Sequence, residues 1–111
     1  LRAADAVLAN LDPFRGCEPD SGTCVEVGFA LALGKPVVGY LRNNESVAER
    51  VARIEGATLE NRAGQPVDRN GLQVEDFGLP LNLMLAAPLK VVIGGLPEAL
   101  RALLDIDSKR N

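Results

Sequence analysis

One carboxylate stands alone in the most apolar stretch of the chain. Residues 20–34 read DSGTCVEVGFALALG, and Glu26 is the only charged residue between Asp20 and Lys35. An ionised carboxylate in an apolar helix is costly unless it is paired, hydrogen-bonded or used in chemistry. Carboxylates can act as nucleophiles that form a covalent intermediate. The first hypothesis is therefore an enzyme whose chemistry depends on Glu26.

A structural role for Glu26 is the alternative. The first turns of helices favour acidic residues, so Asp20 or Ser21 could be the N-cap and Glu26 could lie along a solvent-facing edge. The neighbours of Glu26 are apolar on every side of the predicted helix: Val25, Val27, Phe29, Leu31 and Leu33. Because a helix that is apolar all round is typically buried, we expect Glu26 to face little open water. The residues alone leave both interpretations open.

Composition limits the kinds of protein that this chain can be. Its 111 residues, 47% hydrophobic and 24% charged, indicate one globular domain over 1–111. A net charge of −3 without a cluster of Lys and Arg argues against nucleic-acid and anionic-membrane partners. The longest apolar run is far shorter than the roughly 20 residues of a membrane span. Because the chain has no His, Ser-His-Asp and Cys-His catalysis and histidine-ligated zinc are excluded for it.

The two cysteines bear on the redox environment of the protein. Cys17 and Cys24 could form a disulfide, but without a secretory signal we favour two reduced thiols in a cytoplasmic protein. Glu18 and Asp20 are too few ligands for a cation, so we expect no metal.

The chain opens with Leu1, and LRAADAVLANLD reads as the end of a helix followed by a strand. We expect N-terminal strand and helix elements to be missing from it.

Apolar runs alternate with turn signals in a way that predicts a parallel α/β sheet with helices on both faces. Strands are predicted at 6–11, 36–41 and 89–93, and helices at 21–33, 45–54, 79–87 and from 97. The polar residues 55–78, dense in turn signals, predict a long loop or lid. Ligands of such sheets bind at the carboxyl ends of the strands, where the loop 12–20 and the start of the Glu26 helix are expected.

Two separated blocks of sequence carry a specific resemblance. The first is DAVLANLDPFRGCEPDSGTCVEVGFALALGKPVV at 5–38, and the second is FGLPLNLML at 77–85. In this order they resemble the nucleoside 2-deoxyribosyltransferase family. The resemblance implies a flavodoxin-like parallel sheet, no cofactor, and 2-deoxynucleosides and free purine or pyrimidine bases as substrates. It also implies transfer of the 2-deoxyribosyl group through a covalent glycosyl-enzyme intermediate, with retention of configuration.

The resemblance assigns roles to individual residues. Glu26 matches the nucleophile, which attacks C1′ from the face opposite the base. Asp20 matches an Asp that contacts the substrate near the leaving base; its alternative is the helix N-cap. Asn82 and Met84 match residues that a subunit lends to its neighbour's site, where Asn82 binds the sugar and Met84 packs against the site. The alternative is a helix packed in the core of its own subunit. If the two residues instead complete a neighbour's site, the enzyme is a homo-oligomer.

Further candidates lie on the rim of the predicted sheet. Phe14 and Arg15 could stack on or cover the base, and Gly22 is a substrate-binding candidate at the helix start. The family also has a tyrosine that orients the nucleophile and a further acidic group, both on the N-terminal elements that we expect to be missing from this chain.

Two other functions are compatible with the same residues. One is a 2-deoxynucleoside 5′-monophosphate N-glycosidase, which gives the intermediate to water and needs phosphate donors such as Ser21, Gly22 and Thr23. The PFRG loop and the NLML block favour the transferase over this hydrolase. The other is a non-catalytic nucleotide-binding module, in which binding would be insensitive to Glu26→Gln.

Overall fold

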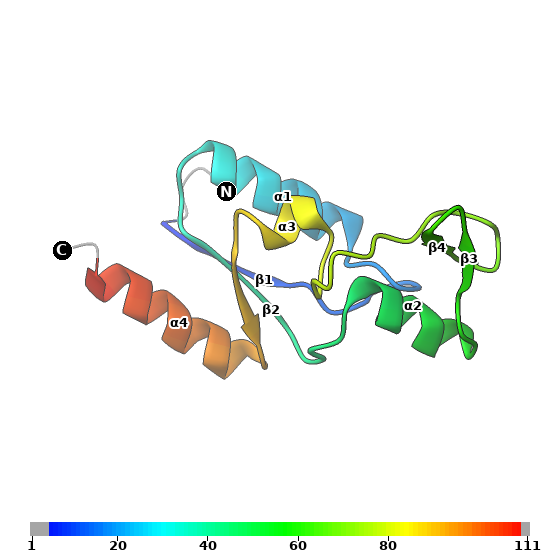
Figure 1. Cartoon of the computed structure of the whole chain (residues 1–111). Helices are drawn as coiled ribbons and strands as arrows, with labels where there is room; N and C mark the ends of the chain where they lie inside the picture. Colours follow the sequence, from blue (N-terminus) through cyan, green and yellow to red (C-terminus); the bar gives the residue numbers. More distant parts are fainter. Residues whose placement is uncertain (1–4, 110–111) are drawn as a thin grey trace. The chain divides into compact units, whose positions relative to one another are not determined.

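The computed structural model describes residues 5–109, with the backbone alone for 107–109. The chain forms two compact units, which are described separately (Figure 1). Leu1–Asn43 and Pro88–Asn111 make up the first, here called the sheet unit, and Asn44–Ala87 make up the second, here called the hairpin unit. Over the described residues, no helix has the length and apolar character needed to cross a membrane.

The sheet unit is a three-stranded parallel sheet between two helices. Its elements are β1 (Val7–Asn10), α1 (Ser21–Ala32), β2 (Val37–Leu41), β5 (Lys90–Ile93) and α4 (Leu96–Lys109). The strand order is β1-β2-β5, and both pairings are parallel. α1 and α4 lie on opposite faces of the sheet (Figure 1). The predicted parallel α/β sheet with helices on both faces is confirmed, and its three strands lie within the predicted ranges.

The core of the sheet unit is built around the central strand β2. Val37, Val38 and Leu41 of this strand are buried. At Gly39 two other side chains come close to the backbone: an added Cβ would lie 2.5 Å from Leu11 Cδ1 and 3.2 Å from Leu89 Cδ1. Real Cβ atoms essentially never come as close as 2.5 Å, so an alanine at this position of β2 would require the Leu11 side chain to shift.

Helix α1 buries one side rather than its whole circumference. Val27 and Ala30 are buried, whereas Val25 is 72% exposed and Glu26 is also exposed. The expectation that Glu26 faces little open water is therefore wrong. A helix on a sheet buries only the side chains that point toward the strands, and the all-apolar pattern of α1 does not distinguish that side from the outer one.

The hairpin unit contains a helix, a short hairpin and one helical turn: α2 (Val47–Glu55), β3 (Glu60–Arg62), β4 (Gln65–Val67) and α3 (Leu83–Ala86). β3 and β4 are antiparallel and joined by Ala63 and Gly64, which both have positive φ, as two-residue hairpin turns require. The segment 55–78, expected as a long loop or lid, thus contains a hairpin, and Val67 and Val74 within it are buried. Its role as a lid stays a prediction.

The helix predicted over 79–87 is reduced to the single turn α3. The Leu79 carbonyl accepts a hydrogen bond from Val47 N–H (3.0 Å), and Leu83 N–H donates to Glu75 Oε2 (2.9 Å). These bonds to other parts of the unit replace the Leu83-to-Leu79 bond of a helix. Tertiary contacts therefore override the helical preference of this segment.

We expect Gly39→Ala to destabilise the protein, because the new methyl group would overlap the Leu11 side chain. Overpacking of this kind costs about 1–3 kcal/mol, which chemical denaturation measures as a lower unfolding midpoint at constant slope. Gly28→Ala is the matched control, since a Cβ there meets nothing within 4 Å. The control should stabilise α1 by about 0.5–1 kcal/mol. A Gly39→Ala protein as stable as wild type would contradict this account of β2.

Candidate active site at the carboxyl edge of the sheet

A polar turn joins the carboxyl ends of β1 and β2. Asn10 ends β1, and its Oδ1 accepts a hydrogen bond from Asp12 N–H (3.0 Å). Asp12 Oδ1 in turn accepts from Arg42 N–H (2.7 Å), directly after β2. Arg42 Nε also lies 3.9 Å from Asp12 Oδ2, but this ion pair is largely solvent-exposed and adds little. Asp12 therefore links the end of β1 to the residue after β2, at the edge where parallel sheets bind ligands.

The loop after this turn presents an aromatic ring. Phe14 N–H donates to the Glu18 carbonyl (3.0 Å), and the turn passes through Gly16 at φ +73°. The Phe14 ring is exposed, and the Arg15 guanidinium carbon lies 5.8 Å from its centre. One face of Phe14 is thus associated with a cation. The role of Phe14 and Arg15 in stacking on or covering a base stays a prediction.

Asp20 is the N-cap of α1, which confirms the structural alternative for this residue. Its Oδ2 accepts hydrogen bonds from Thr23 N–H (3.0 Å) and Thr23 Oγ1 (3.1 Å). The position also receives the positive end of the helix dipole. A Cβ on Gly22 would lie 3.2 Å from Asp20 Oδ2, so glycine at this position leaves the cap undisturbed.

A hollow of about 240 Å³ lies between the sheet edge and the start of α1. Its lining consists of Asn10, Asp12, Pro13, Phe14, Asp20 and Thr23. It brings together two predicted site residues, Phe14 and Asp20, with two that sequence reasoning missed, Asn10 and Asp12. Asn10 and Asp12 could have been predicted as site residues, because they lie at the carboxyl end of the first predicted strand. The hollow is smaller than the roughly 300–1,000 Å³ of drug-sized sites.

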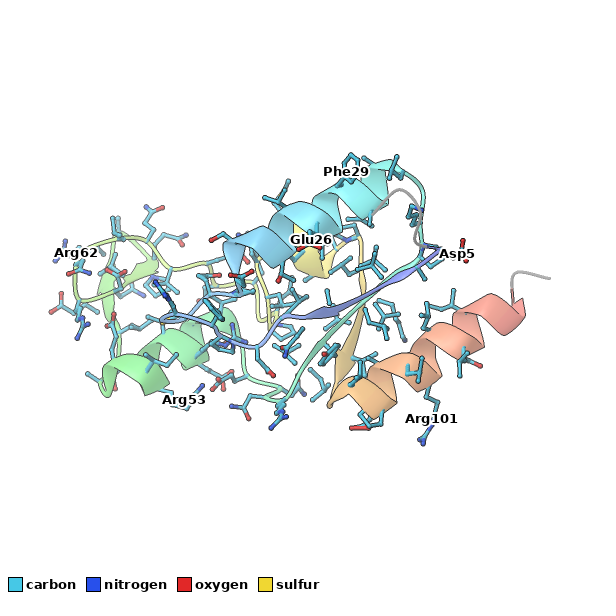
Figure 2. All side chains as sticks on the ribbon, turned by 180° about the vertical axis from the view of Figure 1, so that it is seen from behind. Asp5, Glu26, Phe29, Arg53, Arg62 and Arg101 are labelled. Atoms are coloured by element: carbon cyan, nitrogen blue, oxygen red, sulfur yellow. The ribbon has the colours of Figure 1, made fainter. Side chains whose placement is uncertain are left out.

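Glu26 lies further along the same helix and outside this lining (Figure 2). It is the sixth residue of α1 and exposed. Because the effect of the helix dipole falls off within the first turn, it acts on Asp20 rather than on Glu26. Gly22 and Glu26 are four residues apart and share one face of the helix.

Asn82 and Met84 belong to the hairpin unit, whereas the hollow is lined by the sheet unit. Asn82 is the N-cap of α3, and its Oδ1 accepts from Met84 N–H (2.8 Å). Asn82 is exposed, the Met84 side chain is 81% exposed, and no residue of α3 is buried. The alternative that this helix packs in the core of its own subunit is therefore wrong.

Cys24 is near the site but is a poor nucleophile. Burial raises the pKa of its thiol, and the carboxylates of Glu18 and Asp20 raise this pKa further. The thiol therefore stays protonated at neutral pH, and thiols react as thiolates. Among the side chains that the structure describes, residues 5–106, no group of three or more His, Cys, Asp or Glu is placed to hold a metal ion.

Comparison with known proteins identifies the family. The family model described as nucleoside 2-deoxyribosyltransferase matches residues 1–84. A 2-desoxiribosyltransferase from Leishmania mexicana has a similar structure, with 35% identity and a TM-score of 0.70 over 94% of this chain and 60% of that one. The uncharacterized protein C191.05c of Schizosaccharomyces pombe is 33% identical over 90 residues, 72% of this chain and 43% of the yeast protein. The chain thus spans about half the length of these relatives, and it belongs to the nucleoside 2-deoxyribosyltransferase family.

Proposed function

We propose that the protein transfers a 2-deoxyribosyl group between nucleobases through a covalent intermediate on Glu26. The observation that carries the proposal is the arrangement on α1, in a chain of this family. Asp20 is fixed at the helix N-terminus in a hollow that Phe14 also lines, and Glu26 follows on the same helix with an exposed carboxylate.

Two displacement steps describe the reaction. A Glu26 carboxylate oxygen forms a bond to C1′ while the C1′–N bond breaks, and the departing base nitrogen gains a proton. In the second step a nitrogen of another base attacks C1′ and gives up its proton, the C1′–O bond breaks and the glutamate is regenerated. The proton taken up by the first base is thereby replaced by the one that the second base releases. Each step inverts C1′ through an oxocarbenium-like state, so the product retains the original configuration. The missing 2′-hydroxyl of the sugar favours this cation, because no electron-withdrawing group lies beside it.

Asp20 is proposed to bind the leaving base while it caps the helix. Both capping hydrogen bonds end on Oδ2, so the cap and a base contact can be divided between the two carboxylate oxygens. From this position Asp20 would hold the base and assist the transfer of its proton. Phe14, exposed on the same hollow, would stack on the ring of the base.

Asn82 and Met84 are proposed to complete the site of a neighbouring subunit in a homo-oligomer. The Asn82 side-chain oxygen caps α3, which leaves its NH₂ group to donate to a sugar oxygen. Met84, exposed beside it, would cover the apolar side of the substrate.

The Asp20 carboxylate also favours the transferase over a 5′-monophosphate glycosidase. Phosphates bind at helix N-termini through backbone N–H groups and the positive end of the dipole. In α1 the Thr23 N–H and hydroxyl are already bonded to Asp20, whose negative charge opposes a phosphate at the same place.

Glu26→Gln tests the nucleophile. The neutral amide should lower base exchange by roughly 10⁴-fold or more, as removal of a covalent nucleophile does in other enzymes. The assay combines 2′-deoxyinosine with adenine or cytosine and separates the exchanged deoxynucleosides by chromatography. Glu60→Gln, an exposed glutamate on β3, should exchange at the wild-type rate. Full activity of Glu26→Gln would contradict the assignment, and release of free deoxyribose without exchange would identify a hydrolase.

Asp20 variants separate capping from base binding. Asp20→Asn keeps the capping oxygen, so its stability should stay close to wild type, whereas Asp20→Ala should lose about 1 kcal/mol. Both variants lack the carboxylate and should lose roughly 10²-fold or more in kcat/KM for base exchange. Thermal unfolding and kinetics on the same samples measure the two effects. If Asp20→Asn retains wild-type kcat/KM, Asp20 serves as a cap alone.

A further inference from the structure

A buried guanidinium lies at the centre of the hairpin unit. Arg50 on α2 is 2% exposed and is the one charged residue among the buried residues of the described chain. Its Nη2 donates to the Pro80 carbonyl (2.5 Å), whereas its Nε lies 3.7 Å from Glu45 Oε1 and has no hydrogen-bond partner within the described residues. Burying a charge with an unsatisfied donor is costly, and replacing a whole buried ion pair by apolar side chains is often neutral or stabilising.

Glu45 forms only a long ion pair with Arg50, with 3.7 Å between Glu45 Oε1 and Arg50 Nε. The Glu45 carboxylate is bound by Arg53 at 2.7, 3.0 and 3.1 Å, and Arg53 lies on the exposed side of α2. This fork geometry satisfies the carboxylate without Arg50. The short contact of Arg50 is instead the main chain at Pro80.

The segment held in this way leads directly into Asn82. Pro80 O accepts from Arg50, the Leu79 carbonyl accepts from Val47 N–H, and the side chain of Leu81 is 1% exposed. α2 thus fixes the backbone of two successive residues before the N-cap of α3. The side chain of Asn82 itself remains exposed on this fixed backbone.

We infer that Arg50 is a positioning residue for substrate binding: by holding the Pro80 carbonyl, it sets the place and direction of the Asn82 amide. The inference rests on the proposed function, in which that amide binds the sugar. A contact made only with the bound sugar contributes equally to the ground state and the transition state. Its loss therefore raises KM and leaves kcat unchanged.

Arg50→Met tests the inference with three readouts. We expect KM for 2′-deoxyinosine in base exchange to rise roughly tenfold, the value of one neutral hydrogen bond, with kcat within twofold of wild type. Asn82→Ala should change KM in the same direction. The unfolding temperature should fall, because the Pro80 carbonyl loses its hydrogen-bond donor and Glu45 loses a nearby cation. A general loss of stability does not by itself raise KM at constant kcat, so the kinetic readout stays specific. Backbone order parameters at Leu83–Ala87, measured by NMR, should drop from about 0.85 toward 0.6.

Two further variants separate positioning from general stability. Arg50→Lys keeps a charged donor of shorter reach and should raise KM only about threefold. Arg53→Met removes the other partner of Glu45 and should match wild type in KM and order parameters. A wild-type KM and unchanged order parameters in Arg50→Met would overturn the inference, as would an equal rise of KM in Arg53→Met. If Arg50→Met does not fold, a wild-type KM for Arg50→Lys overturns it.

The order parameters also separate this inference from the proposed function. If the wild-type protein shows no base exchange, the proposed function fails and KM has no meaning. Loss of order at Leu83–Ala87 in Arg50→Met would then still support positioning of the Asn82 segment, and unchanged order would overturn it.

Discussion

The burial of β2 between its two parallel neighbours is the constraint on which the sheet unit depends. Val38 and Leu41 fill the core, and Gly39 admits the side chains of Leu11 and Leu89 over the same strand. Because both pairings are parallel, the strands end at one edge. Asp12, Phe14 and the start of α1 follow β1 at that edge, so the packing of the core also gathers the residues of the candidate site.

The exposure of Glu26 has a consequence for the proposed chemistry. A glycosyl-enzyme intermediate that is open to water would be hydrolysed, so transfer to a second base requires that water be kept out. The described chain leaves the Glu26 carboxylate exposed. We propose that the substrate, together with Asn82 and Met84 of a neighbouring subunit, keeps water away from the Glu26 intermediate. The transferase activity would then depend on assembly, whereas the nucleophile and the base site would belong to one chain.

Much of the fold could be predicted because buried parallel strands are continuous apolar runs with clear turn signals between them. The N-cap at Asp20 was also available from the sequence, since Asp precedes a helix start and Thr follows three residues later. The exposure of Glu26 could not be predicted, because an apolar pattern does not show which side of a helix meets the sheet. Asn10 and Asp12 resemble ordinary turn residues until the sheet places them beside the start of α1. The length of α3 depends on hydrogen bonds with α2 and with Glu75, which no local pattern contains.

The most direct test of the central claim is to isolate the covalent intermediate. A deoxynucleoside with fluorine at C2′ destabilises the oxocarbenium-like state of both steps, so the glycosyl-enzyme can accumulate when the base is a good leaving group. Peptide mass spectrometry after proteolysis would locate the sugar. We expect one 2-fluoro-2-deoxypentosyl adduct on the peptide that contains Glu26, lost when a free base is added. An adduct on another residue, or base exchange without any adduct, would contradict it.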